Sequence, residues 1–254
     1  MSGKYYLEKI RDMLDRIEGD QWPQIERAAT LVADVIAEGG VVHIFGSGHT
    51  HILAEEVWCR AGGLAAVSPI LDPDQMPYTG PFKGSALEKL EGFGTILFET
   101  HDARPKEVII VVSNSGRNPV PIEIAMAAKE RGLTIITLTS MDYSRNVSPR
   151  HSSGKRLFEL ADLVIDNCSP MGDATVELEG LPQKVGPTST VTNAIILNAI
   201  IVEAATKLLE RGIEPPIFVS ANLDVPMDLN MRLIERYRDR VHLFDRYPEQ
   251  PPSQ

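Results

Sequence analysis

The first 40 residues carry apolar side chains in two helical patterns. In the first, residues 4–18 repeat apolar positions every three or four residues until Gly19 interrupts them. A second pattern covers residues 22–38, has Pro23 in its first turn and ends at a pair of glycines. We expect an antiparallel helical hairpin over residues 1–39 that packs on the following domain and offers a surface for dimerisation.

After residue 40 the pattern changes to short apolar runs that alternate with helical segments. Such runs are typical of strands buried on both faces of a parallel sheet, and the alternation favours right-handed crossovers. We predict an α/β fold, a doubly wound parallel five-stranded sheet, over residues 40–212. The strands are expected at 41–45, 64–68, 107–113, 133–140 and 161–167, and the main helices at 49–61, 87–101, 118–131 and 188–210.

Three segments lie outside this pattern. Residues 69–84 and 168–186 are rich in Gly and Pro, so we expect surface loops there, close to a ligand. Residues 213–254 form a C-terminal tail with a helix near 229–240. We expect this tail to wrap around the domain or around a neighbouring subunit.

The composition is that of a globular protein without export or zinc-finger signals. The two cysteines, Cys59 and Cys168, form no CxxC pattern, and we expect both to be buried. The N-terminus lacks the apolar core of a signal peptide, and no apolar run is long enough to span a bilayer. We therefore expect a cytoplasmic protein without membrane contact. The formal net charge of −10 and the lack of a basic run argue against nucleic-acid binding.

Three segments combine small hydroxyl-bearing residues with the start of a predicted helix. Helix N-termini offer unpaired N–H groups, and loops at the carboxyl ends of parallel strands surround a common ligand region, so together they could hold a phosphate group. Taken singly, each Ser or Thr could equally be a helix cap. The residues concerned are Ser47, Gly48 and Thr50 in the first segment, Ser113, Asn114, Ser115, Gly116 and Asn118 in the second, and Ser189 and Thr190 in the third.

The first segment does not match the common nucleotide-binding motifs. The Walker A pattern GxxxxGK[ST] is absent, and His51 stands where the dinucleotide fingerprint requires a third glycine. We therefore expect no nucleotide, flavin or nicotinamide cofactor.

Residues 113–118, Ser-Asn-Ser-Gly-Arg-Asn, resemble the signature Ser-x-Ser-Gly-x-(Thr/Asn) of the sugar isomerase (SIS) domain family. The turn Gly46-x-Gly48-x-Thr50 and the pair Ser189-Thr190 also resemble parts of that family's site, in the same order and spacing. The whole chain resembles bacterial SIS proteins described as phosphosugar isomerases. The resemblance implies a flavodoxin-like or Rossmann-like SIS fold. It also implies phosphate contacts from Ser113, Asn114, Ser115 and Asn118, with Thr50 and Ser189 nearby.

Isomerisation of a sugar phosphate needs a base that moves a proton between neighbouring carbons. His51 and Glu55 lie four residues apart on the helix expected after the first segment, so they share one face. The resemblance to SIS isomerases adds Glu177, in the loop before the last helix, and His101, which could reach the site of a neighbouring subunit. Each of the four could instead be a solvent-exposed or helix-terminal residue without a chemical role.

The sequence does not favour a metal site. SIS phosphoheptose isomerases have a Gln and a His in the last helix, where this chain has Ile196 and Glu203. His49 and His51 are two residues apart and do not share a helical face, which disfavours a metal site made of these two and Glu55.

Three functions remain open at this point, and one of them is a structural assembly protein whose pocket is vestigial, against which the intact phosphate segments argue. Of the other two, the first is an enzyme that isomerises a hexose phosphate or amino-sugar phosphate, or cleaves an ether of one. The second is a non-catalytic sensor that binds a sugar phosphate and acts through a protein partner. Only about 40 residues precede the first strand, too few for the helix-turn-helix domain of SIS regulators. For either function we expect a homodimer or homotetramer.

Overall fold

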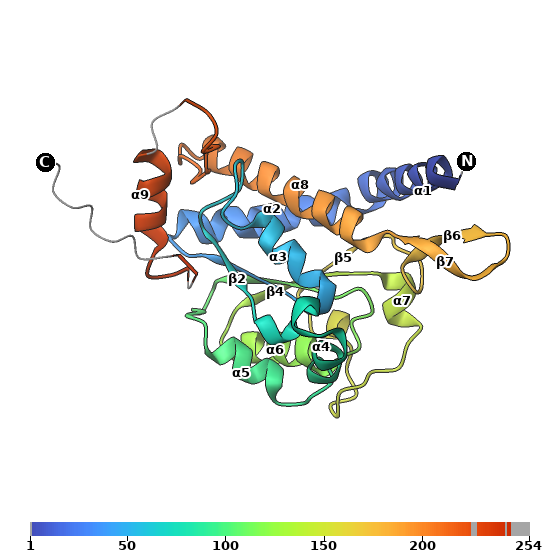
Figure 1. Cartoon of the computed structure of the whole chain (residues 1–254). Coiled ribbons are helices and arrows are strands. Elements are labelled where there is room, and N and C mark those ends of the chain that lie inside the picture. The colour runs from blue at the N-terminus through green and yellow to red at the C-terminus, as the bar shows by residue number, and fades with distance from the viewer. Residues whose placement is uncertain (1, 225–227, 242, 245–254) are drawn as a thin grey trace, which may run out of the picture.

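The computed structural model describes residues 2–224, 228–241 and 243–244 and contains a five-stranded sheet (Figure 1). The sheet is parallel throughout, with the spatial order β2-β1-β3-β4-β5. This arrangement confirms the predicted α/β fold. The strands are β1 (Val42–Gly46), β2 (Val67–Ile70), β3 (Val108–Val112), β4 (Thr134–Thr139) and β5 (Leu163–Asp166).

Helices cover both faces of the sheet (Figure 1). On one face, α2 (Trp22–Ala37), α3 (Ile52–Val57) and α8 (Ser189–Glu210) share a hydrophobic core with the strands. On the other face, α5 (Phe93–Glu99) and α6 (Pro119–Glu130) form a second core. Because both faces are covered, β1 and β3 are buried along their whole length, which explains their continuous apolar sequence.

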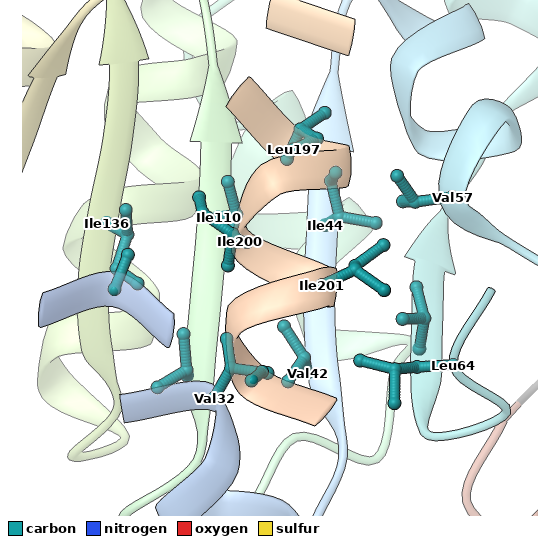
Figure 2. Packing of buried hydrophobic residues seen from close by; sticks show 14 of the residues in the cluster. Val32, Val42, Ile44, Val57, Leu64, Ile110, Ile136, Leu197, Ile200 and Ile201 are labelled. Carbon is teal, nitrogen blue, oxygen red and sulfur yellow. The ribbon is translucent and has the colours of Figure 1, made fainter. Parts of the chain in front are cut away.

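The larger core lies between the sheet and the pair of helices α2 and α8 (Figure 2). Ile200 and Ile201 of α8 pack here with Ile44 of β1 and Ile110 of β3, and all four side chains are buried. By length and composition alone, α8 is apolar enough to cross a membrane. Its packing on α2 and on the sheet accounts for the buried part of these apolar side chains, as in the core helix of a globular domain, whereas Val191, Ile195, Val202 and Leu209 are exposed.

The N-terminal segment is one long helix, and the predicted antiparallel hairpin is wrong (Figure 1). The first part, α1 (Ser2–Arg16), continues into α2 through a π-helical turn, η1 (Ile17–Gln21). The residues on both sides of η1 keep right-handed helical dihedral angles. Gly19 therefore does not end the helix, because a π turn accommodates one additional residue within it.

The segment 168–186, which we predicted to be a loop, contains a small second sheet. Strands β6 (Ala174–Leu178) and β7 (Leu181–Pro187) pair antiparallel, and the hairpin packs against α1. Most residues of the two strands are exposed or only partly buried. The sequence shows no apolar run here because the hairpin contributes little to either core.

Two predicted helices are shorter than their sequence patterns suggested. The helix after β1 ends at Val57, so Cys59 is exposed and not buried as predicted, whereas Cys168 is buried as expected. The predicted helix 87–101 is replaced by α4 (Pro81–Leu87) and α5, because Gly92 adopts a φ of +91° at the start of α5. The remaining short elements are η2 (Gly48–His51), η3 (Pro73–Gln75), η4 (Pro77–Thr79), α7 (Met141–Arg145) and η5 (Leu157–Glu159).

The C-terminal tail packs back on the domain. Ile217 forms an isolated β-bridge with Leu64, and α9 (Asp228–Tyr237) follows, one residue from the predicted start of the tail helix. Beyond α9, the guanidinium of Arg240 donates to the carboxylate of Glu107 at 2.6 Å. Glu107 immediately precedes β3, so the tail is held at the amino edge of the sheet.

Glu107 is the most strongly hydrogen-bonded carboxylate at that edge. Besides Arg240, the backbone N–H groups of Val41 and Arg104 donate to it at 3.0 and 2.8 Å, and Nε2 of His43 lies 3.0 Å from its Oε2. Burial raises the pKa of Glu107, but the hydrogen bonds outweigh burial and lower the pKa from 4.5 to about 2.

The substitution Glu107→Gln should destabilise the protein at neutral pH by an amount that shrinks in acid. The unfolded chain binds a proton at Glu107 near pH 4.5 and the folded chain only near pH 2. The stabilisation is therefore complete above about pH 5 and is lost as the pH falls toward 2. Thermal unfolding at about pH 7, 5 and 3 measures this difference, which we expect to reach several degrees of Tm at neutral pH.

The matched control is Glu99→Gln, because Glu99 forms an exposed ion pair with Arg131. It should change stability little at any of these pH values. A loss of stability in Glu107→Gln that is equally large at every pH would contradict the lowered pKa of Glu107.

Candidate functional site

The first two predicted phosphate segments leave neighbouring strands at the same level of the sheet. Gly46 ends β1 and Val112 ends β3, and these residues are direct partners in the parallel register. Ser47 and Ser113 therefore begin two loops side by side. From β1 the sheet continues to β2 on one side and from β3 to β4 on the other. Such a reversal is where open α/β sheets bind ligands, outside the carboxyl ends of the strands.

The loop after β1 is a tight turn that leads into η2 and α3. A Cβ on Gly46 would lie 2.6 Å from the carbonyl oxygen of Thr50, so only glycine fits this position. Gly48 adopts a φ of +56°, and the N–H of Thr50 donates to the carbonyl of Ser47 at 3.0 Å. Of the predicted site residues in this loop, Ser47 and Thr50 are both buried.

Ser47 is bonded to a carboxylate that the sequence did not single out. Its hydroxyl donates to Oε1 of Glu88 at 2.7 Å. Glu88 follows α4, and its backbone carbonyl accepts from the N–H of Val120, in the first turn of α6, at 3.3 Å. Glu88 thus connects the loop after β1 with the helix that follows the second loop. No sequence pattern pointed to Glu88, because residues 87–101 have the pattern of one uninterrupted helix.

The loop after β3 is fixed by its own hydrogen bonds. The Ser113 hydroxyl accepts from the N–H of Gly116 at 3.2 Å, and Oδ1 of Asn114 accepts from Nδ2 of Asn167 at 3.0 Å. Gly116 has a φ of +58°, and a Cβ there would lie 2.8 Å from the hydroxyl oxygen of Ser144. This loop therefore has one well-defined shape, held against the chain that follows β4 and β5.

Ser115 and Asn118 are the residues of this loop best placed for a ligand. The Ser115 side chain has no hydrogen-bond partner among the residues that the structure describes. Asn118 precedes the 12-residue helix α6 without capping it, and its Oδ1 accepts from the guanidinium of Arg150 at 2.9 Å. A free hydroxyl in the loop 113–118 and a cation bonded to the same loop thus lie at the start of α6.

The third predicted segment is already occupied by a carboxylate of the chain. Oδ1 of Asp173 accepts from the N–H groups of Thr188 and Ser189 at 3.0 and 2.7 Å, and Oδ2 accepts from the Ser189 hydroxyl at 2.9 Å. Asp173 therefore caps α8 and balances the positive end of its dipole. A phosphate contact from Ser189 would compete with Asp173, whereas Thr190 is partly exposed and makes no such contact. In the sequence, only the presence of Asp173 in the loop before α8 could have indicated that a carboxylate caps this helix.

His51 and Glu55 lie on one face of the helical segment after the first loop, as their spacing predicts. Nδ1 of His51 is 2.5 Å from the carbonyl oxygen of Gly48, and its Nε2 is 3.6 Å from Oε1 of Glu55. In the neutral ring, Nδ1 therefore carries the proton and Nε2 is the acceptor. The His51 side chain is buried, whereas that of Glu55 is 48% exposed.

The other two catalytic candidates lie away from both loops. Glu177 belongs to β6 in the exposed hairpin, where its carboxylate pairs with Lys184 at 3.0 Å (Figure 1). His101 follows α5, with Nδ1 2.9 Å from the carbonyl oxygen of Leu97. Since the chain enters β3 shortly after, His101 lies at the amino edge of the sheet, opposite the two loops. A role for either residue would require a second subunit.

Cys168, which follows β5, is unsuited as a nucleophile. Burial and, to a smaller degree, the nearby Asp166 raise the pKa of its thiol to about 11, so it is protonated at neutral pH. Within residues 2–224, 228–241 and 243–244, no group of three or more His, Cys, Asp or Glu side chains could hold a metal ion.

Comparison with known proteins places this fold and these loops in a family. Residues 5–140 match the model of the SIS domain, a stretch that contains both loops at the ends of β1 and β3. The phosphoheptose isomerase GmhA from Neisseria gonorrhoeae has the same fold, with a TM-score of 0.54 over 80% of this chain and 96% of that chain. A phosphoheptose isomerase from Francisella tularensis gives a TM-score of 0.52 over the same shares. Both are 16% identical to this chain, so the likeness is one of fold.

Other relatives resemble the chain along nearly its whole length. A UPF0309 protein from Caldanaerobacter subterraneus subsp. tengcongensis is 44% identical over 239 residues, which cover 93% of this chain and 97% of the relative. A UPF0309 protein from Geobacillus kaustophilus is 42% identical over 236 residues, which cover 93% and 94%. The chain therefore belongs to the SIS domain family, and its relatives at this level of identity are UPF0309 proteins.

Proposed function

We propose that this protein binds a phosphorylated sugar at the carboxyl ends of β1 and β3. The observation that carries the proposal is the loop 113–118, where the Ser115 hydroxyl is free near the positive end of the α6 dipole and Arg150 lies alongside. Phosphate oxygens accept hydrogen bonds from such groups, and a charge-assisted bond is roughly twice as strong as a neutral one. Because the loop is already fixed, binding need not order it.

The net charge of the chain makes these local donors necessary. A protein with a formal charge of −10 repels anions at long range. At physiological ionic strength this repulsion is screened beyond about 8 Å, so groups close to the ligand decide binding. Arg117, within the loop, donates to the hydroxyl of Ser148 at 3.1 Å and adds a second cation beside Arg150.

The reaction that we propose is aldose–ketose isomerisation of a hexose phosphate or an amino-sugar phosphate. A sugar held by its phosphate at the loop after β3 would extend its other end toward the loop after β1. That loop leads to His51, whose Nε2 acceptor is suited to proton exchange with a sugar hydroxyl during ring opening. The SIS family match and the fold shared with two phosphoheptose isomerases support a ligand of this class.

We also propose that the protein is a homo-oligomer. Val191, Ile195, Val202 and Leu209 of α8 form an apolar stripe at helical spacing, and each is at least 37% exposed. Trp22 of α2, also 37% exposed, lies in the same hollow as Ile195 and Val202. Contiguous exposed apolar surface favours association, and a second copy would cover it. The same surface could serve the alternative function, a sensor that binds the sugar phosphate without turnover and acts on a partner protein.

Sugar phosphates should raise the Tm of the protein, and the matched free sugars should not. A ligand at 100 times its Kd stabilises the folded state by about 2.7 kcal/mol, or roughly 5–10 °C in Tm for a chain of this size. A thermal-shift comparison of glucose 6-phosphate, fructose 6-phosphate and glucosamine 6-phosphate with glucose, fructose and glucosamine measures this. If no phosphorylated sugar shifts the Tm, this ligand class is wrong.

The substitution Ser115→Ala should weaken binding of the active sugar phosphate by roughly 10- to 100-fold and leave the Tm of the free protein unchanged. Its hydroxyl bonds no described residue, and a hydrogen bond to a charged group contributes about 1.5–3 kcal/mol. Ser113→Ala should also lower the Tm, because that hydroxyl holds Gly116. The control Ser220→Ala, at a hydroxyl bonded to the N–H of Asn222 in the tail, should change neither quantity. Equal affinities of Ser115→Ala and the unmodified protein would contradict the phosphate site.

The substitution Val202→Glu should weaken self-association at least about tenfold, because it places a charge in the apolar stripe of α8. Light scattering should then show more of the 28.0 kDa chain as monomer at the same concentration. The control is Ile96→Glu on α5, a residue of similar exposure (62% against 63%) on the opposite face of the sheet. An unmodified protein that is monomeric at micromolar concentration would refute the proposal.

A further inference from the structure

The carboxylate of Glu88 lies beside the loop after β1 and keeps one oxygen free. It accepts the Ser47 hydroxyl on Oε1 at 2.7 Å, while Oε2 has no partner among the described residues. Its backbone is bonded to the first turn of α6 through Val120. Glu88 therefore lies between the loop after β1 and the helix that begins at the proposed phosphate loop.

The segment that carries Glu88 is held on both sides. On the α4 side, its N–H donates to the carbonyl of Gly84 at 2.9 Å. On the other side, the buried carboxylate of Glu123 in α6 accepts the N–H of Gly94 at 2.8 Å. Although residues 88–92 are not helical, their position relative to α6 is fixed. A base on this segment would therefore stay at a constant distance from a ligand bound beside α6.

The other carboxylates near the three segments are less suited to exchange a proton. Both oxygens of Asp173 accept hydrogen bonds at the N-terminus of α8, so neither is free toward a ligand. Glu55 is half exposed and pairs with His51 along its own helix. Glu177 points from the exposed hairpin to Lys184. Glu88 combines a free oxygen with a fixed position between the two loops.

We propose that Glu88 is the base that moves the proton between the two carbons of the sugar, an inference that rests on the proposed function. A hexose whose phosphate is bound at the loop after β3 would extend its C1–C2 end to the loop after β1, where Glu88 is bonded to Ser47. In the forward step the carboxylate takes the proton from C2 of the open-chain aldose. The C2–H electron pair forms the C1=C2 bond, and the C1=O1 π pair passes to O1, which takes up a proton to give the enediol.

The second half of the reaction returns a proton from Glu88, and this proton can exchange with solvent while it is on the carboxylate. The hydroxyl on C2 loses its proton, the C2=O2 bond forms, and the C1=C2 pair takes the proton back from Glu88 at C1. The net change is one proton from C2 to C1 and one from O2 to O1, with no change in oxidation state of the molecule as a whole. No oxidant, reductant or co-reactant is required.

The bond to Glu88 also changes the role expected for Ser47. A hydroxyl has one proton to donate, and here that proton is directed to the carboxylate. In this arrangement Ser47 is a positioning residue for Glu88 and is not a donor to phosphate. The phosphate contacts are left to Ser115 and the rest of the loop 113–118.

The test compares binding with exchange of carbon-bound hydrogen in Glu88→Gln. Glutamine keeps an oxygen that accepts from Ser47 but cannot take up the proton. With the sugar phosphate that shifts the Tm of the unmodified protein, we expect the Kd of Glu88→Gln to stay within about threefold. Deuterium incorporation at C1 or C2 in D₂O, followed by NMR, should fall by at least about 100-fold. The matched control is Glu91→Gln, three residues along the same segment, where the carboxylate holds exposed Ser152; its exchange rate should be unchanged.

Each other outcome counts against the assignment in a distinct way. Exchange that persists in Glu88→Gln would show that another group is the base. Joint loss of binding and exchange would show that Glu88 holds the ligand or the loop. Binding without exchange in the unmodified protein would overturn the role of Glu88 and leave the sugar-phosphate site intact. The absence of binding in the unmodified protein would overturn the proposed function itself.

Discussion

The parallel pairing of β1 with β3 determines where a ligand can meet this protein. Because Gly46 and Val112 are partners in the register, two loops of unrelated sequence begin one residue later, about one strand spacing of 4.8 Å apart. One loop has the free hydroxyl and the uncapped helix N-terminus. The other leads to a histidine and is bonded to Glu88. Neither loop carries a complete site, and it is the register of two buried strands that brings their groups together.

An acidic protein that binds an anion must keep its own carboxylates away from its donors. In two of the three hydroxyl-rich segments a carboxylate of the chain already accepts these donors: Asp173 caps the N-terminus of α8, and Glu88 accepts the hydrogen bond of the Ser47 hydroxyl. The loop 113–118 keeps a free hydroxyl and an uncapped helix, with guanidinium groups beside it. Three segments that look alike in sequence are therefore different in the folded protein. The difference comes from distant residues that the local pattern does not contain.

The sequence predicted those features whose cause is local. Strands β1 and β3 are recognisable because both faces are buried. The helix starts at Pro119 and Ser189 coincide with Pro and hydroxyl residues whose preferences are short-range. Features with a distant cause were missed. Residues 87–101 look helical throughout, but a left-handed glycine and contacts with α6 divide them, and this division brings Glu88 to Ser47. The hairpin of β6 and β7 was missed because it packs on α1 and leaves its strands exposed.

An α-helix turns by about 100° per residue, so the additional residue accommodated in η1 sets the rotation of α1 relative to α2. In the present setting, Ile10 and Met13 of α1 reach the same core as Ile25 of α2. A deletion of one residue within Ile17–Gln21 would keep the helix continuous but would turn α1 by about that angle, and a charged face would meet the hairpin instead. The number of residues in η1 therefore determines which face of α1 packs on the domain. A related chain with one residue fewer in this turn would need its apolar residues on α1 shifted by one position in the sequence.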